Sequence, residues 1–155
     1  MEAIWTSVVA VGGTLMGAVI THLFQLTASG RSELFARSEA LRQERIATYS
    51  SFAAAVEDYR HGQADRWYRK QQDPDAEVFI TARDEAHRLR TVTRQVLYRV
   101  KLLTDDQEVI LAAERAYQCA RNVSTARDQA ERDTLDAQAR HEIEAFVAHA
   151  SPLTR

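Results

Sequence analysis

The first pattern along the chain is a long segment without charge. No Lys, Arg, Asp or Glu lies between Glu2 and Arg31, and residues 4–26 are mostly apolar, with His22 as their one titratable side chain. A segment of this length is enough to cross the ~30 Å hydrocarbon core of a bilayer as an α-helix. The sequence therefore predicts a transmembrane anchor and hinge at residues 1–30 and a second domain at residues 31–155.

Two other interpretations of the uncharged segment stay open. A cleaved signal peptide has a basic start, a short apolar core and a cleavage site of small residues. Residues 1–3 instead carry an acid and no base, and residues 26–29 form a poor cleavage site. A core helix of a soluble protein rarely stays uncharged for so long. A retained anchor fits these features best.

Small residues recur along the same segment at steps of three and four. They are Ala3, Ser7, Ala10, Thr14, Gly17 and Thr21, with Gly13 beside them. Such a stripe lets two helix backbones come close together in a membrane, although many membrane-spanning helices are rich in Gly and Ala without it. The residues that we expect at an interface between copies of the chain are Ala10, Gly13, Thr14, Gly17 and Thr21.

The orientation of this anchor follows from the basic residues around it. Arg31, Arg37, Arg42 and Arg45 follow the segment, and no Lys or Arg precedes it. The positive-inside rule then places residues 31–155 in the cytoplasm and the N-terminus outside, in a single-pass protein of the inner (cytoplasmic) membrane. Cys119 is the only cysteine and cannot form an intramolecular disulfide, which agrees with a reducing compartment.

A long helix is predicted directly after the anchor. From Ile46 to Trp67 apolar residues recur every three or four positions, which is typical of one buried helix face. Before Ile46 the pattern is thinner and predicts an exposed stalk or a weak coiled coil. Whether the anchor helix continues through residues 27–30 into this helix is open, and we favour continuity because one Gly costs only ~1 kcal/mol.

The pattern is interrupted at Pro74, where Asp73 is expected to cap the next helix. That second helix is predicted at residues 75–103. The acidic pair before residue 107 should cap a third helix that ends near residue 123. A last helical region is expected from about residue 124 to 150, and whether residues 121–124 divide it from the third helix stays open.

The predicted fold is therefore all-α. It consists of an N-terminal transmembrane helix followed by an antiparallel three- to four-helix cytoplasmic bundle with a long first helix, because short connections join antiparallel neighbours. The inward polar side chains that we expect in this bundle are mainly Gln63 and Thr93. Basic residues gather in the second helix and acids after residue 104, which predicts ion pairs between adjacent helices.

The densest local feature is residues 59–70, which mix aromatic and basic side chains at the far end of the long helix. Trp, Tyr and Arg are common anchors of protein interfaces. The candidate partner-binding residues are Arg60, Arg66, Trp67, Tyr68 and Arg69. In the alternative interpretation, Trp67 belongs to the core and the Arg side chains are solvated.

Catalytic and metal-binding patterns are weak. Asp58 and His61, like Asp84 and His87, have the Asp-x-x-His spacing that resembles the Glu-x-x-His motifs of di-metal bundles. On a helical wheel both pairs lie outside the apolar stripe, so we expect no metal ion and no cofactor. The sequence has no nucleophile elbow, phosphate-binding loop or zinc signature. We therefore expect no enzymatic activity.

Net charge limits the partners. The formal charge of −2 predicts no general attraction to nucleic acid, although the basic residues of the second helix could form a stripe for anionic lipid or nucleic acid. The partners that we expect are membrane lipid, other copies of the chain and a cytoplasmic protein.

The uncharged segment, the sequence of residues 41–52 and the Asp65-Arg66-Trp67-Tyr68-Arg69 run together resemble small actinobacterial single-pass membrane proteins with a helical cytoplasmic domain. This resemblance implies no activity and no site residues. Our first hypothesis is a non-enzymatic membrane protein that self-associates and presents its helical domain for partner binding or scaffolding. The alternative is a membrane-perturbing, pore-type effector, for example in phage defence, controlled by its cytoplasmic bundle.

Overall fold

The computed structural model describes the backbone of residues 2–155 and the side chains of residues 35–155. The described chain is helical, which confirms the predicted all-α class. Its elements are α1 (Glu2–Gln72), α2 (Glu77–Leu103), α3 (Gln107–Asn122), the 3₁₀ turn η1 (Val123–Thr125), α4 (Gln129–Ala150) and the 3₁₀ turn η2 (Ser151–Thr154). Two compact units result, Met1–Leu41 and Arg42–Arg155.

The first unit belongs to α1, which continues through residues 27–30 without a break. Phe35 is 76% exposed and Leu41 is 42% exposed, as expected for the thinly apolar stalk. Among residues 35–155, whose side chains the structure describes, no helix has the length and hydropathy needed to cross a bilayer, and the predicted anchor of residues 4–26 lies outside that range. The expected interface residues lie outside the described side chains; they are Ala10, Gly13, Thr14, Gly17 and Thr21.

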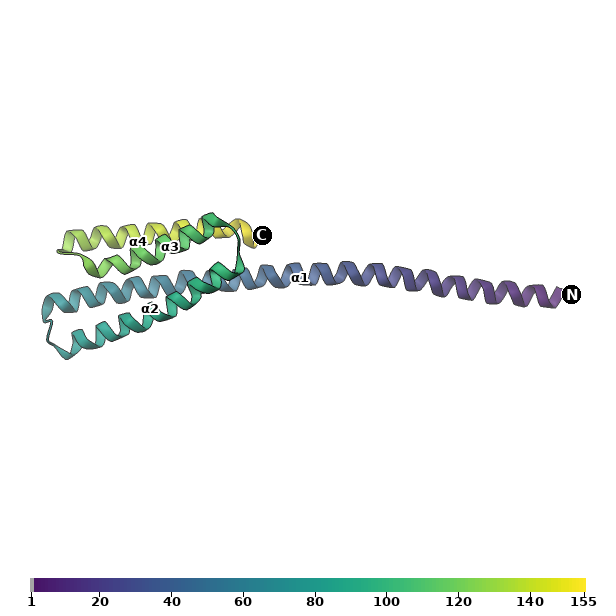
Figure 1. The fold of residues 1–155 in the computed structure, drawn as a ribbon, viewed down its shortest axis with the longest axis horizontal. Helices are drawn as coiled ribbons and strands as arrows, with labels where there is room; N and C mark the ends of the chain where they lie inside the picture. Colours follow the sequence, from purple (N-terminus) through teal and green to yellow (C-terminus); the bar gives the residue numbers. More distant parts are fainter. Residues whose placement is uncertain (1) are drawn as a thin grey trace. The chain divides into compact units, whose positions relative to one another are not determined.

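The second unit is an antiparallel four-helix bundle. In Figure 1 the chain reverses direction at each connection, so that α2 returns along the second half of α1, and α3 and α4 run in opposite directions beside each other. This confirms the predicted antiparallel order. The connections are short, at residues 73–76, 104–106 and 123–128, and short connections favour antiparallel neighbours.

Side chains from all four helices build one core. The buried apolar residues that form it include Phe52, Val56 and Tyr59 of α1, Leu97 and Val100 of α2, Val109, Ala112, Ala113, Ala116 and Ala120 of α3, and Ile143 and Phe146 of α4. The rings of Phe52 and Phe146 meet edge to face with centroids 4.8 Å apart. The Ala-rich face of α3 leaves little side-chain volume, which lets its neighbours pack closely.

Gly62 leaves room on α1 for the end of the Leu89 side chain of α2. A Cβ atom at this position would lie 2.6 Å from Cδ1 of Leu89 on α2. Thr93 of α2 also contacts α1: its hydroxyl lies 2.9 Å from the carbonyl oxygen of Ala55 and 2.8 Å from that of Leu89, and these two acceptors share its one proton. Thr93 is fully buried, so the expectation of an inward Thr93 is confirmed.

Ion pairs join neighbouring helices on the outside of the bundle. Lys101 of α2 pairs with Glu114 of α3, and Arg115 of α3 pairs with Glu142 of α4 at 3.2 Å. The first of these confirms that the basic second helix meets acids of the following helix. Such exposed pairs each contribute at most about 1 kcal/mol.

The predicted start of the second helix is wrong by two residues. α2 begins at Glu77, and its N-cap residue, Ala76, makes no capping hydrogen bond with its side chain. The Asp73 carboxylate instead accepts the backbone N–H of Asp75 at 3.0 Å. Because Asp side chains readily bond the backbone two residues on, they stabilise turns as well as helix starts. Pro74 therefore lies in the turn.

The two later helix starts follow their caps. The Asp106 carboxylate accepts the N–H groups of Glu108 and Val109, as predicted for the third helix. The last helical region is divided from the third by η1, and α4 begins where the Asp128 carboxylate accepts the N–H of Glu131. A capping Asp accepts a backbone N–H that the first helical turn leaves free. The Asp128 cap therefore favours a separate helix after η1, the division that the sequence pattern did not decide.

Candidate functional site

The candidate partner-binding residues do not share one surface. Arg60 is 5% exposed. Its guanidinium pairs with Glu57 one turn earlier at 2.5 Å and with Asp136 of α4. Arg140 also approaches the Asp136 carboxylate, at 3.4 Å. Arg60 is thus part of a buried ionic network that joins α1 to α4, and it offers no free charge to a partner.

This network gives stability a defined pH dependence. The hydrogen bond from Arg60 holds the pKa of Glu57 below its ordinary value of 4.5. A lowered folded-state pKa stabilises the fold above the unfolded pKa, and this contribution is lost as pH falls through the folded value. We expect the urea midpoint of the natural chain to exceed that of Arg60→Met by a margin that shrinks below about pH 4.5. Other carboxylates titrate in both proteins, so their effects largely cancel in this difference. A difference in urea midpoint that stays constant with pH would contradict the role given to the Arg60–Glu57 pair.

Trp67 is also buried. Its indole N–H donates to the carbonyl oxygen of Ala126, beyond η1, at 2.8 Å. The guanidinium carbon of Arg132 on α4 lies 5.7 Å from the centroid of the Trp67 ring. The indole therefore fastens the end of α1 to the connection before α4, as the core interpretation of Trp67 expected.

The other three candidates point in different directions. Tyr68 is about half exposed, and Arg69 pairs with Asp65 on the same helix at 3.2 Å. Arg66 lines a cavity with residues of α2 and α3. Successive helix residues are turned by about 100°. A run of neighbours in sequence is therefore distributed around α1 rather than gathered on one face.

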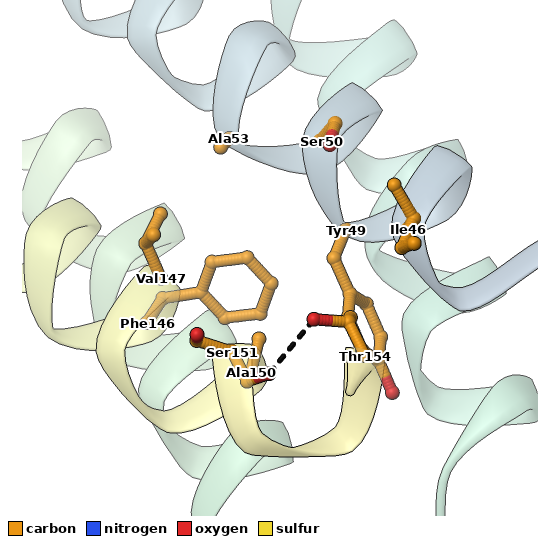
Figure 2. A pocket seen from close by; sticks show the side chains of 9 residues that line it. All are labelled: Ile46, Tyr49, Ser50, Ala53, Phe146, Val147, Ala150, Ser151 and Thr154. Atoms are coloured by element: carbon orange, nitrogen blue, oxygen red, sulfur yellow. Dashed lines mark hydrogen bonds between the residues drawn. The ribbon is translucent and has the colours of Figure 1, made fainter. Parts of the chain in front are cut away.

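One hollow of the bundle is an apolar groove between α1 and its C-terminal neighbours (Figure 2). It has a volume of about 410 Å³. The residues that define this apolar groove are Ile46, Tyr49, Ser50 and Ala53 of α1, Phe146, Val147 and Ala150 of α4, and Ser151 and Thr154 of η2. Two of its apolar side chains remain partly open to solvent, since Ile46 is 39% and Val147 is 48% exposed.

Contacts between side chains and backbone connect the residues at the floor and the end of the groove. Figure 2 shows the ring of Phe146 directed toward the side chain of Tyr49, and the two ring centroids lie 6.0 Å apart in an edge-to-face arrangement. The Thr154 hydroxyl donates to the carbonyl oxygen of Ser151 at 2.7 Å. Arg42 donates to the carbonyl oxygen of Thr154 at 3.1 Å, which holds η2 against α1.

A second hollow, the basic cavity, lies at the other end of the bundle. Its volume is about 490 Å³, and α1, α2, α3 and the η1 region all contribute to its wall. The basic residues that define it are Arg66, Lys70, His87, Arg90 and Arg121. No Asp or Glu is among the described residues that line it. The sequence prediction included Arg66 but missed the other four as members of one site.

The two Asp-x-x-His motifs stay on the surface. Asp58, His61, Asp84 and His87 are all exposed, as the helical wheel predicted. In the part of the chain whose side chains are described, no three His, Cys, Asp or Glu residues converge as metal ligands. Cys119 is partly buried, and this burial raises the pKa of its thiol, which makes the reactive thiolate less available.

Comparison with protein families gives a match over the bundle. Residues 46–154 match the family described as KilB plasmid transfer protein. No curated protein and no solved structure matches the chain. The matched range coincides with the helical bundle, including the apolar groove and the basic cavity. The chain belongs to the KilB plasmid transfer protein family.

Proposed function

We propose that this chain is a non-enzymatic, membrane-attached protein of plasmid transfer that self-associates and acts as a scaffold through its helical bundle. The observation that carries the proposal is the position of the family match, since residues 46–154 take in the bundle and leave out the uncharged segment. The role in transfer is therefore assigned to the bundle, and membrane attachment to residues 4–26.

Two features support self-association, namely the small-residue stripe of the uncharged segment and the apolar groove of the bundle. The stripe of small residues in the uncharged segment is typical of close helix pairs in membranes. Copies held together there would raise the local concentration of their bundles, so that even a weak second contact becomes occupied. We propose that a second copy occupies the apolar groove, where Ile46 and Val147 leave apolar surface open to solvent.

The experiment that tests this function compares the mass of the full-length protein in native-like lipid with that of residues 31–155 alone. A defined oligomer of the full-length chain is expected. If residues 31–155 form the same oligomer, the bundle drives assembly. If only the full-length chain assembles, the membrane stripe drives it. A monomer in both samples would contradict the scaffold. The pore-type effector stays a prediction that no described residue tests.

Replacing Gly13 and Gly17 together by Ile should reduce crosslinking between copies in membranes. Two branched side chains in the stripe would hold the helix backbones apart. The matched change in the bundle is Val147→Glu, which places a charge in the apolar groove and should weaken only the contact between bundles. Crosslinking that stays unchanged in the Gly13→Ile, Gly17→Ile protein would remove the membrane interface from the proposal.

A further inference from the structure

The basic cavity concentrates positive charge from separate parts of the chain. Arg66 and Lys70 come from one face of α1, Arg90 from α2, and Arg121 from the end of α3. Four basic residues from three helices thus line one hollow of about 490 Å³. Like charges near one another repel, so an anion placed among them would be attracted to all of them.

Elsewhere in the bundle, many basic side chains are compensated within the chain. Arg60, Lys101 and Arg115 pair with carboxylates of other residues, and several others pair along their own helix. By contrast, Arg66, Lys70, Arg90 and Arg121 have no carboxylate within 4.0 Å among the described side chains. Arg90 instead donates to the hydroxyl of Tyr117 at 3.4 Å. The positive charges that line the cavity are therefore not neutralised by carboxylates of the described chain.

Polar groups beneath the cations add a second observation. Gln63 is 4% exposed, and its Nε2 donates to the Tyr59 hydroxyl and to the carbonyl oxygen of Arg121, each at 3.1 Å. Its Oε1 has no donor among the described residues. The Tyr59 ring stacks on Tyr117 with centroids 5.7 Å apart. These contacts join Tyr59 and Gln63 of α1 to α3 in the wall of the cavity.

The charges also act on the wall itself. Burial raises the pKa of the Tyr59 hydroxyl, while the guanidinium groups of Arg90, Arg121 and Arg66 act in the opposite direction. The positive field of three elements therefore reaches the same buried atom. A site with this field attracts an anion into a volume typical of small-molecule pockets, about 300–1,000 Å³.

We infer that the basic cavity binds a pyrophosphate group, either as free pyrophosphate or as part of a nucleoside di- or triphosphate. Guanidinium groups match phosphate oxygens with paired, charge-assisted hydrogen bonds, and a pyrophosphate carries enough negative charge to occupy several of them at once. The hollow is formed by converging helices, which favours a compact anion over the long backbone of a nucleic acid. This inference is independent of self-association.

The test is calorimetric titration of the full-length protein in lipid nanodiscs with sodium pyrophosphate, ADP and ATP. Binding is expected for at least one, with an affinity that falls as salt is raised. In the double variant Arg66→Gln, Arg121→Gln, the affinity should fall by at least about tenfold, because two charge-assisted hydrogen bonds are lost. Comparison of the three ligands distinguishes free pyrophosphate from a nucleotide.

The matched control is Arg83→Gln, Arg88→Gln, which removes two positive charges from exposed positions of α2 that already pair with Asp84 and Glu85. It should bind as the natural chain does. Circular dichroism melting should show both double variants folded, since Arg66 and Arg121 are not core residues. Three results would overturn the inference. The first is no binding of pyrophosphate, ADP or ATP, and the second is an equal loss of affinity in the control variant. The third is a single-stranded oligonucleotide or anionic vesicle that binds through the cavity when these three ligands do not.

Discussion

Replacing Asp136 by Ala is expected to destabilise the helical bundle by about 3 kcal/mol, the lower end of the range for breaking a buried ion pair. The substitution removes the α4 partner of Arg60. Because the Arg60 side chain is only 6% exposed, water cannot replace the lost carboxylate. Glu57 remains as a second partner, which is why the cost should not be higher. Urea unfolding followed by circular dichroism measures it.

Two control variants test whether the loss comes from the buried ion pair of Arg60 and Asp136 rather than from removing any carboxylate of α4. Asp133→Ala removes an exposed carboxylate of the same helix that pairs only with its neighbour Arg132, and it should change stability by less than about 0.5 kcal/mol. Arg60→Met with Asp136→Leu removes both buried charges and should recover most of the loss, since an apolar pair of similar size avoids the cost of desolvation. An Asp136→Ala protein as stable as Asp133→Ala would show that the network adds nothing.

This ionic network shows where prediction from the sequence reaches its limit. Arg60 was expected at a partner-binding tip because it lies among aromatic and basic neighbours. Its carboxylate partner, Asp136, lies 76 residues later on α4. A helical pattern reports which residues share a face of one helix, but it carries no information on which distant side chain that face will meet. Arg60 is therefore buried by a contact that its own helix does not encode.

The parts that could be predicted depend on local rules. Apolar spacing placed Phe52, Val56 and Tyr59 on one face of the long helix, and all three are buried. The Asp106 cap could be found because it acts within one turn of its own position. Gln63 was expected inside for the same reason of spacing, and it is 4% exposed.

The basic cavity was missed because its members come from three helices. The sequence showed Arg90 as one of several basic residues of the second helix, and Arg121 as part of an uncertain boundary. Their convergence on Arg66 and Lys70 requires the antiparallel order and the break at η1 to be known first. The candidate site is thus a property of packing between helices.

Trp67→Ala should destabilise the bundle strongly, with a loss of about 3–5 kcal/mol. The substitution removes a side chain that is 5% exposed. It also removes the indole N–H that donates to the carbonyl oxygen of Ala126 at 2.8 Å. Domains of this size are stable by only about 5–15 kcal/mol. We expect a much lower melting temperature, measured by circular dichroism.

Neighbouring variants divide this loss into packing and hydrogen bonding. Trp67→Phe keeps an aromatic ring but cannot donate to Ala126, and it should cost about 1–3 kcal/mol, the penalty for one unsatisfied buried acceptor together with the smaller ring. Tyr68→Ala, at the next and half-exposed position, should cost less than about 1 kcal/mol. If Trp67→Ala melted like Tyr68→Ala, the indole would not fasten α1 to the α3–α4 connection, and its place in a partner-binding surface would return as the better explanation.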